Sequence, residues 1–311
     1  MKSRIANKLL AFYGLAHWDS SGLEDTVLIT GTGRSGTTWF GEVLNSQNDF
    51  RVIFEPFNNH KVGVVRRWRD REYLCFDSEP SLRAEVGRII TGDIRSLWTD
   101  QFNRRLFATR RLIKAIRSHF LTGYIAQEFP GVKQLLVIRN PRAVAQSKMK
   151  LGWKASLEPY LGNSSLISGF FSGVATTVAS LEDPFDIFVA QWCMENYVAL
   201  KHLGYKENAK VVFYEDLVAS PGEYFPPIFE FVGLDFGLVT QEALSAASRM
   251  AGKRDSGRSN QRETGYRERC LKLTELFGMH SLYGDRDKPL VSADDAAAVA
   301  FSDLPTSNRV C

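Results

Sequence analysis

The chain has few cysteines and no long hydrophobic run. Its 311 residues include four cysteines, which are far apart and form neither a CxxC pair nor a His/Cys metal pattern: Cys75, Cys193, Cys270 and Cys311. A disulfide framework and a zinc site are therefore not expected. No apolar run approaches the roughly 20 residues that a membrane-spanning helix needs. We expect a reducing, cytoplasmic compartment, no transmembrane segment and no required metal.

The sequence also lacks internal repeats, low-complexity tracts and a clear signal peptide. Residues 1–18 carry Lys8 ahead of a short apolar cluster, but no small-residue cleavage site follows. We interpret residues 1–22 as an N-terminal helical segment packed on the domain, with peripheral membrane contact as the alternative.

Charge of one sign is not in large excess, since the net charge is +4. It is unevenly placed, because residues 51–118 contain 15 Lys and Arg against 8 Asp and Glu. Such a concentration can steer anionic ligands toward a cleft, or it can be a solvated arginine-rich surface. We expect no nucleic-acid partner, and the sequence indicates no particular oligomeric state.

Short apolar segments alternate with long helical stretches. Residues 27–30, 135–138 and 211–214 are typical of strands, and residues 112–116 are a fourth candidate. Segments of this length, joined by helical crossovers, favour a mainly parallel sheet covered on both faces. We predict an α/β fold of the P-loop NTPase type, a single three-layer domain over residues 1–311 with helices flanking the sheet.

Other parts of this domain are less regular. Residues 186–203 have helical periodicity and end at Gly204. Residues 152–184 are rich in Gly and Ser, which predicts an irregular or short-helical insertion that is either a lid or a connection. Residues 292–311 are expected to form a peripheral tail.

A glycine-rich loop follows the first of these strands. It runs from Gly31 to Gly36, between an apolar strand and a helix, an arrangement that wraps backbone N–H groups around a phosphate. The loop of NTP-hydrolysing proteins has a lysine where this chain has Thr37, and the cation here is Arg34. The loop therefore predicts a bound nucleotide. The absence of the lysine argues against an ATPase.

A second polar motif follows residues 135–138. The strand delivers Arg139 to its end, Asn140 can cap the next helix, and Pro141 can begin it. Ser147 lies two helical turns further on, about 12 Å along the helix axis. Arg139 and Ser147 can therefore contact one phosphate only if the strand approaches the helix from its side.

Three motifs in this order resemble the sulfotransferases that use 3′-phosphoadenosine-5′-phosphosulfate. They are GTGRSGTTWFGEVLN from Gly31, VIRNPRAVAQS from Val137 and VVFYEDL from Val211. Arg-Ser-Gly in the loop and Phe-Glu-Pro at residues 54–56 look more like the carbohydrate sulfotransferases than the cytosolic enzymes, which have lysine in place of Arg34.

The resemblance implies a donor site. The loop residues would hold the 5′-phosphosulfate, and Arg139 with Ser147 would hold the 3′-phosphate, as a guanidinium and a helix N-terminus suit anions. Trp39 would stack on the adenine and Tyr214 would lie at its edge, although Trp39 can also be a core residue. The loop residues concerned are Arg34, Ser35, Gly36, Thr37 and Thr38.

A basic loop near the C-terminus completes the 3′-phosphate site in this family. Lys253 and Arg254, or Arg258, could do so here. The alternative is a solvated basic face that also includes Arg262, Arg267 and Arg269.

Sulfuryl transfer needs a base for the acceptor proton and cations for the leaving group. We assign the role of base to Glu55, which follows a strand-like segment beginning at Arg51. Arg34, Ser35 and the loop amides are assigned to stabilise the charge on the leaving group. The alternative to this catalytic role is that Glu55 forms a structural salt bridge with a nearby arginine. His119 and His60 are alternative bases, and Lys114 could bind the sulfuryl group.

Carbohydrate is the first choice of acceptor, as a glycan or a small molecule. Other alcohols, an amine, a lipid headgroup and a protein tyrosine are the alternative acceptors.

Two other functions compete with sulfuryl transfer. One is a nucleotide kinase or NTPase, in which the acidic residues after Val211 would bind a metal. The other is a non-catalytic binder of polyanions.

Overall fold

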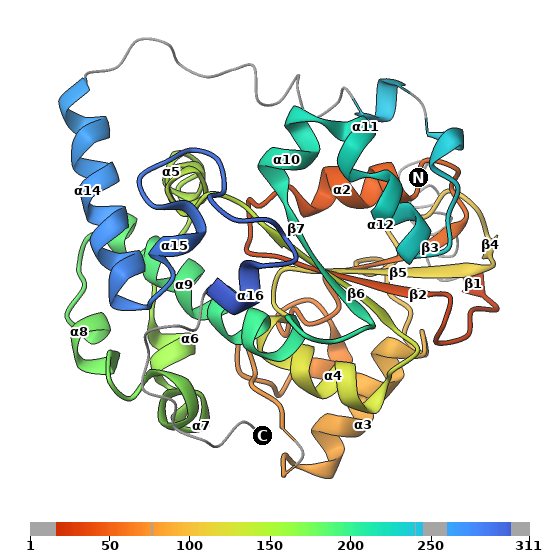
Figure 1. Cartoon of the computed structure of the whole chain (residues 1–311). Coiled ribbons are helices and arrows are strands. Elements are labelled where there is room, and N and C mark those ends of the chain that lie inside the picture. Colours follow the sequence, from red (N-terminus) through yellow and green to blue (C-terminus); the bar gives the residue numbers. More distant parts are fainter. Residues whose placement is uncertain (1–16, 76, 240, 245–259, 300–311) are drawn as a thin grey trace, which may run out of the picture.

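The computed structural model describes residues 17–75, 77–239, 241–244 and 260–299. At its centre is a five-stranded sheet in the order β3-β5-β2-β6-β7, with every neighbouring pair parallel (Figure 1). The strands are β2 (Thr26–Thr30), β3 (Phe50–Phe54), β5 (Arg110–Ala115), β6 (Lys133–Ile138) and β7 (Ala209–Phe213). The predicted parallel sheet is confirmed.

Helices cover both faces of this sheet, which explains why its strands are apolar on both sides. On one face lie α2 (Thr37–Leu44), α10 (Tyr214–Ala219), α11 (Pro221–Tyr224) and α12 (Pro226–Phe231), and on the other α3 (Pro80–Ile90) and α4 (Thr122–Glu128) (Figure 1). Ile29 packs with Phe40 of α2, whereas Leu28 points to the opposite face and packs with Ile90. The predicted three-layer architecture is confirmed.

Three further helices pack against one another beside the β6–β7 side of the sheet. They are α5 (Pro141–Lys150), α9 (Pro184–Leu203) and α14 (Asn260–Leu276). The predicted helix is α9, and its Trp192 is fully buried. Gly204 follows it because a Cβ there would come within 1.9 Å of the Ala297 Cβ. Smaller helices are η1 (Gly63–Val65), η2 (His119–Leu121), η4 (Phe236–Leu238) and α15 (His280–Tyr283).

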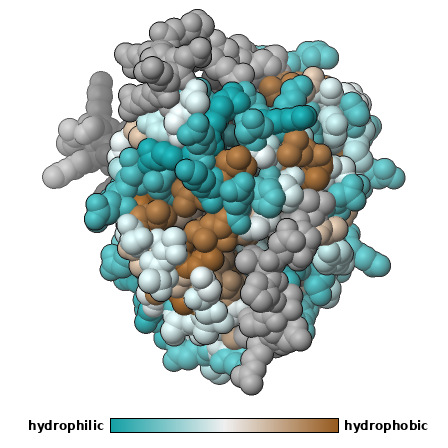
Figure 2. All heavy atoms as spheres, turned by 60° about the vertical axis from the view of Figure 1, so that its left-hand side comes forward, coloured by the Kyte–Doolittle hydropathy of each residue, from teal (hydrophilic) through white to brown (hydrophobic). Residues whose placement is uncertain are grey.

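Residues 152–184 form short helices, as predicted. These are α6 (Glu158–Leu161), α7 (Ser164–Leu166), the π-helical turn η3 (Ile167–Phe171) and α8 (Ala175–Ala179). Tyr160, Leu166 and Phe171 are buried in the same core as α9, so much of this insertion is packed connection. Figure 2 turns this side of the molecule forward and shows apolar patches between larger hydrophilic areas.

The described part of the N-terminal segment is extended and not helical, in contrast to the prediction. Residues 1–16 lie outside the described residues, and residues 17–22 are not helical. Trp18–Asp19 instead form strand β1, which pairs in parallel with β4 (Phe107–Ala108). The Asp19 carboxylate accepts hydrogen bonds from Arg51 and Arg111, and these ion pairs hold the segment in an extended conformation.

The C-terminal tail is less peripheral than predicted. Ala296 and Ala297, in α16 (Ala296–Val299), are 0% and 1% exposed, because this short helix packs against α9. Residues 300–311 lie outside the described residues.

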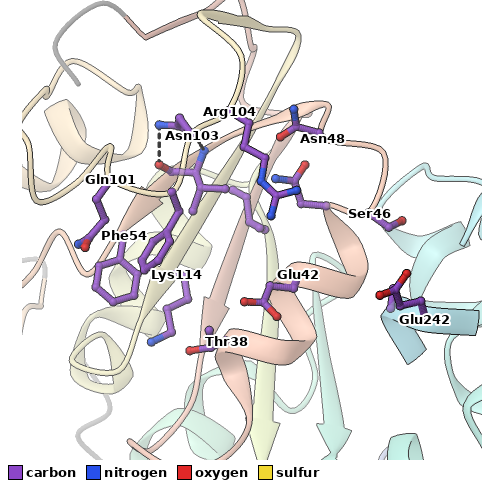
Figure 3. A pocket seen from close by; sticks show the side chains of 16 residues that line it. Thr38, Glu42, Ser46, Asn48, Phe54, Gln101, Asn103, Arg104, Lys114 and Glu242 are labelled. Atoms are coloured by element: carbon purple, nitrogen blue, oxygen red, sulfur yellow. Dashed lines mark hydrogen bonds between the residues drawn. The ribbon is translucent and has the colours of Figure 1, made fainter. Parts of the chain in front are cut away.

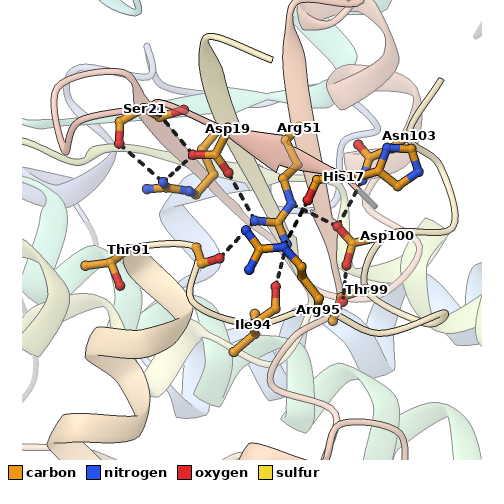
Figure 4. Close-up of polar contacts among 12 residues, drawn as sticks. His17, Asp19, Ser21, Arg51, Thr91, Ile94, Arg95, Thr99, Asp100 and Asn103 are labelled. Carbon is orange, nitrogen blue, oxygen red and sulfur yellow. Dashed lines mark hydrogen bonds and ion pairs between the residues drawn. The ribbon is translucent and has the colours of Figure 1, made fainter. Parts of the chain in front are cut away.

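A buried polar network holds the β3 edge of the sheet (Figure 4). Arg51 donates from Nε to Asp100 at 2.9 Å and from Nη1 to Asp19 at 3.1 Å. Asn103 accepts from the Val52 amide at 2.6 Å and donates to the Val52 carbonyl at 3.1 Å. The Asn103 side chain thus satisfies backbone groups of this edge strand where a further strand would otherwise pair.

Candidate functional site

The glycine loop lies at the carboxyl end of β2 and leads into α2. Gly36 is the residue before the helix and has a φ of 86°. A Cβ at Gly36 would lie 2.4 Å from the Tyr214 ring, and one at Gly31 would lie 2.7 Å from the Val137 carbonyl oxygen. Glycine is therefore required at Gly36 for conformation and at both positions for close packing.

The helix following this loop begins with unpaired amides. The Phe40 amide donates to the Gly36 carbonyl at 3.0 Å, so the amides of Thr37, Thr38 and Trp39 have no acceptor within the helix. Ser35 is fully buried, and its Oγ has no hydrogen-bond partner among the described residues. The loop thus presents donors of the kind that bind a phosphate or sulfate.

Arg139, from the end of β6, meets the same loop. Its Nη1 donates to the Arg34 carbonyl at 2.9 Å, and its guanidinium lies 4.5 Å from the centre of the Tyr214 ring. Arg34 in turn donates from Nε to the Ser147 Oγ at 3.1 Å. Arg34 thus contacts both Arg139 and Ser147, and the three residues form one cluster.

A cavity of about 680 Å³ opens at this cluster, and we call it the donor cavity. The predicted residues that line it are Arg34, Gly36, Thr37, Thr38, Trp39, Glu55, Lys114, Arg139, Ser147 and Tyr214. Ser35 and His119 are not among the lining residues, and His60 is exposed outside it. Strand ends far apart in the sequence therefore converge as expected for a parallel sheet.

Glu55 is 3% exposed and lies directly after β3, at a φ of 44°. One carboxylate oxygen accepts from the Lys114 ammonium at 2.5 Å, and the other accepts from the Ile116 amide at 3.0 Å. Arg117 is 3.9 Å from the second oxygen. The main ionic partner of Glu55 is thus a lysine, and the arginine foreseen as its competing partner is more distant.

His119 lies in a buried polar cluster beneath the site. Its Nε2 is 4.0 Å from one carboxylate oxygen of Glu195, and the other oxygen forms an ion pair with Arg71 at 2.7 Å. Burial lowers the pKa of His119 to about 4, with Arg71 and Lys148 acting in the same direction and Glu195 opposing them. Neither ring nitrogen has a hydrogen-bond partner among the described residues. His119 is therefore a neutral, enclosed imidazole.

Trp39 belongs to both the core and the donor cavity. It is 6% exposed, and its ring packs edge-on against Tyr214 at 5.9 Å and against Phe225 at 5.6 Å. Its indole nitrogen donates to the Ala243 carbonyl at 3.0 Å. The two roles weighed for Trp39 are thus compatible, because this core residue also lines the donor cavity.

The C-terminal basic cluster is described only in part. Lys253, Arg254 and Arg258 lie outside the described residues, as does the side chain of Arg262. Arg269 pairs with Asp183 at 2.7 Å, and Arg267 donates to the Asp285 carbonyl at 2.9 Å. These two arginines serve surface contacts, as the alternative of a solvated face implied.

Several cavity residues were not identified from the sequence: Asn58, Trp98, Arg117 and Trp153. Trp153 covers the glycine loop, where a Cβ on Gly33 would lie 2.8 Å from the Trp153 ring. Arg117 follows β5 by two residues, and this position at a strand end was the available signal. Arg51, Arg71 and Arg111 are held in buried ion pairs elsewhere, so the basic excess of residues 51–118 does not form one patch.

Within the described ranges, no group of three or more His, Cys, Asp or Glu side chains is arranged to hold a metal ion. No helix of that part of the chain has the length and apolar composition to cross a membrane. Cys75, Cys193 and Cys270, the cysteines that the structure describes there, are free thiols.

One protein-family model matches most of this chain. Residues 26–237 match the model of the sulfotransferase family. The chain is 23% identical over 258 residues to an uncharacterized protein of Archaeoglobus fulgidus, in a match covering 66% of this chain and 83% of that protein. Solved structures that it resembles include a sulfotransferase from Alicyclobacillus acidocaldarius, with 12% identity and a TM-score of 0.44 over 81% of this chain and 93% of that one. The sulfotransferase domain of the Synechococcus PCC 7002 olefin synthase gives 17% identity and a TM-score of 0.41, over 84% and 95%.

Proposed function

The chain belongs to the sulfotransferase family, and from this premise we propose that it transfers a sulfuryl group from 3′-phosphoadenosine-5′-phosphosulfate to a hydroxyl group of a carbohydrate. The observation that carries the proposal is the contact of Arg34 with both Ser147 and Arg139, at 3.1 Å and 2.9 Å. A ligand with two separate anionic groups can then engage the glycine loop and the end of β6 together.

The residues present fit such a donor. The 5′-phosphosulfate would be held by the α2 amides, Arg34, and the buried and unpartnered Oγ of Ser35. The 3′-phosphate would be held by Arg139 and Ser147, and the Nε of Arg139 has no partner among the described residues. Lys253 and Arg254 stay candidates for the same phosphate.

Trp39 and Tyr214 are proposed to hold the adenine. Both line the donor cavity, and Tyr214 directly follows β7. The centres of their rings are 5.9 Å apart in an edge-on arrangement. A purine that binds against Trp39 would therefore contact aromatic side chains that core packing holds in position.

When bound, the donor supplies the sulfuryl group. The acceptor proton is taken by Glu55, whose carboxylate is oriented by Lys114 and the Ile116 amide. Arg34 and the α2 amides stabilise the charge that grows on the leaving phosphate. We assign a sulfuryl oxygen to Lys114, and its position in the lining of the donor cavity beside Glu55 supports this role. No metal is needed in this scheme.

Ligand-induced stabilisation tests the proposal. We expect adenosine 3′,5′-bisphosphate to raise the melting temperature in the presence of EDTA, and ATP with Mg²⁺ to have a smaller effect. Transfer of ³⁵S from the labelled donor to a carbohydrate panel then tests the reaction itself. Stabilisation by ATP with Mg²⁺ alone would favour a nucleotide kinase or NTPase, whose loop lysine this chain replaces with Thr37.

A further inference from the structure

A second cavity of about 670 Å³ adjoins the donor cavity on the β3 side of α2 (Figure 3). We call it the side groove, and it lies between α2 with the turn that follows and the segment 101–104. Four residues line both cavities: Thr38, Glu42, Phe54 and Lys114. The side groove therefore begins beside Lys114, which is paired with Glu55.

The charges that line the side groove balance one another. They are the carboxylates of Glu42 and Glu242 and the cations of Arg104 and Lys114. Lys114 is already bound to Glu55 at 2.5 Å. A polyanion in this groove would thus meet no excess of positive charge along its length.

The donor cavity has the opposite character. Its lining has four cations against two carboxylates, and the cations are Arg34, Lys114, Arg117 and Arg139. The two cavities are therefore electrostatically distinct, one suited to an anionic ligand and the other to an uncharged one.

Hydroxyl and amide groups supply most of the other polar atoms in the side groove. Thr38, Asn45 and Ser46 come from α2 and its end, Asn48 follows, and Gln101 lies opposite (Figure 3). The Asn45 oxygen accepts from the Phe50 amide at 3.1 Å, so its position is fixed by β3. Such groups donate to and accept from sugar hydroxyls without requiring a charge on the ligand.

An aromatic ridge joins the two cavities. Phe54 packs against Phe102 at 4.7 Å and against Trp98 at 5.4 Å. Trp98 lines the donor cavity and Phe102 lines the side groove, where it is 50% exposed. The Phe54 amide donates to the Thr99 carbonyl at 2.8 Å, and this bond helps to fix the ridge on the edge of the sheet.

We propose that the side groove binds an uncharged glycan chain whose terminal sugar presents the acceptor hydroxyl at Glu55. The apolar faces of the sugar rings stack on Phe102 and Phe54, and their hydroxyl edges bond to Asn48 and Gln101. This inference rests on the proposed sulfuryl transfer and narrows its acceptor to neutral oligosaccharides, as against sulfated or uronate-rich polymers.

The test measures binding to the protein saturated with adenosine 3′,5′-bisphosphate. The neutral probes are maltoheptaose, cellopentaose and chitopentaose, and the comparison probes are a heparan sulfate oligosaccharide and 2-naphthol. Binding of each probe is measured by calorimetry and by saturation-transfer NMR. We expect at least one neutral oligosaccharide to bind, and Phe102→Ala to weaken it about three- to tenfold through lost stacking. Phe107→Ala is the matched control, since Phe107 is 58% exposed and outside the side groove.

Several outcomes would overturn the inference. Binding of heparan sulfate or 2-naphthol without any neutral oligosaccharide would do so, as would binding of none of the probes. An equal effect of Phe102→Ala and Phe107→Ala would place the glycan elsewhere. Bisphosphate binding, measured in the same samples, separates the two proposals, because its absence overturns sulfuryl transfer and the groove assignment with it.

Discussion

The Glu55 carboxylate and the Lys114 ammonium group are 2.5 Å apart at the ends of the neighbouring strands β3 and β5. Glu55 adopts a left-handed backbone conformation at a φ of 44°. Such a conformation costs about 1–3 kcal/mol and is concentrated at functional sites. An ordinary surface ion pair would need neither this strain nor this burial, so Glu55 is the first residue to test as the base.

We expect Glu55→Gln to lower turnover about 10²- to 10⁴-fold, the usual effect of losing a general base. The glutamine oxygen can still accept from the Ile116 amide, so the affinity for adenosine 3′,5′-bisphosphate should change little. Initial rates with the labelled donor and calorimetry measure the two quantities. Glu128→Gln, at an exposed position of α4, is the control. Full turnover in Glu55→Gln would assign the proton transfer to another group.

Arg139→Ala should weaken binding of adenosine 3′,5′-bisphosphate about 10- to 100-fold, because a charge-assisted hydrogen bond to a phosphate is lost. Turnover at saturating donor should fall much less. Calorimetric titration measures the affinity, and Lys150→Ala, at the exposed end of α5, is the matched cation control. Equal affinities for the two variants would remove Arg139 from the donor site.

Gly36→Ala should disrupt the loop, because the new Cβ would lie 2.4 Å from the Tyr214 ring at a φ of 86°. We expect a loss of more than about 1 kcal/mol in the free energy of unfolding and a smaller stabilisation by adenosine 3′,5′-bisphosphate. Thermal melts with and without the ligand measure both effects. Gly173→Ala is the control, since its Cβ would meet nothing within 4 Å. Unchanged melts of Gly36→Ala would contradict the loop geometry.

The buried His119 should make stability depend on pH. Its pKa is lowered to about 4 in the folded chain from 6.5, chiefly by burial. Between these values the unfolded chain binds more protons, so the free energy of unfolding should decrease as the pH falls from about 6.5 toward 4. Urea titrations of His119→Gln should show a shallower decrease than wild type, and His60→Gln, at an exposed site, should follow wild type. A greater loss of turnover than of stability in His119→Gln would instead indicate a catalytic role.

Arg51→Met should be strongly destabilising, by about 3–5 kcal/mol, because Asp100 would be left buried without its cation and Asp19 would keep only Arg111. Arg105→Ala breaks an exposed pair with Asp49 and should cost at most about 1 kcal/mol. Urea denaturation measures both. Similar losses in the two variants would mean that the buried network does not hold the β3 edge.

Local sequence patterns were sufficient to predict the parallel sheet and the glycine loop. The segments of β2 and β6 are apolar on both faces, so a buried parallel sheet follows from their composition. The loop from Gly31 to Gly36 could be recognised from the sequence because a phosphate-binding loop is a short, continuous motif. For the same reason the sequence showed Thr37 at the position where NTP-hydrolysing proteins have lysine. Trp18–Asp19 was missed, since its strand depends on pairing with Phe107–Ala108 and on two distant arginines.

The residue pattern alone predicted the glycine loop, the strand ends that carry Arg139 and Glu55, and the family resemblance. It could not establish which side chains meet, because Arg34 bonds Ser147 across 113 positions and accepts from Arg139 across 105. Nor could it show that His119 is enclosed while Glu55 faces the cavity. Those outcomes depend on how helices and loops pack around the sheet, since packing determines which polar groups are buried and which reach a ligand.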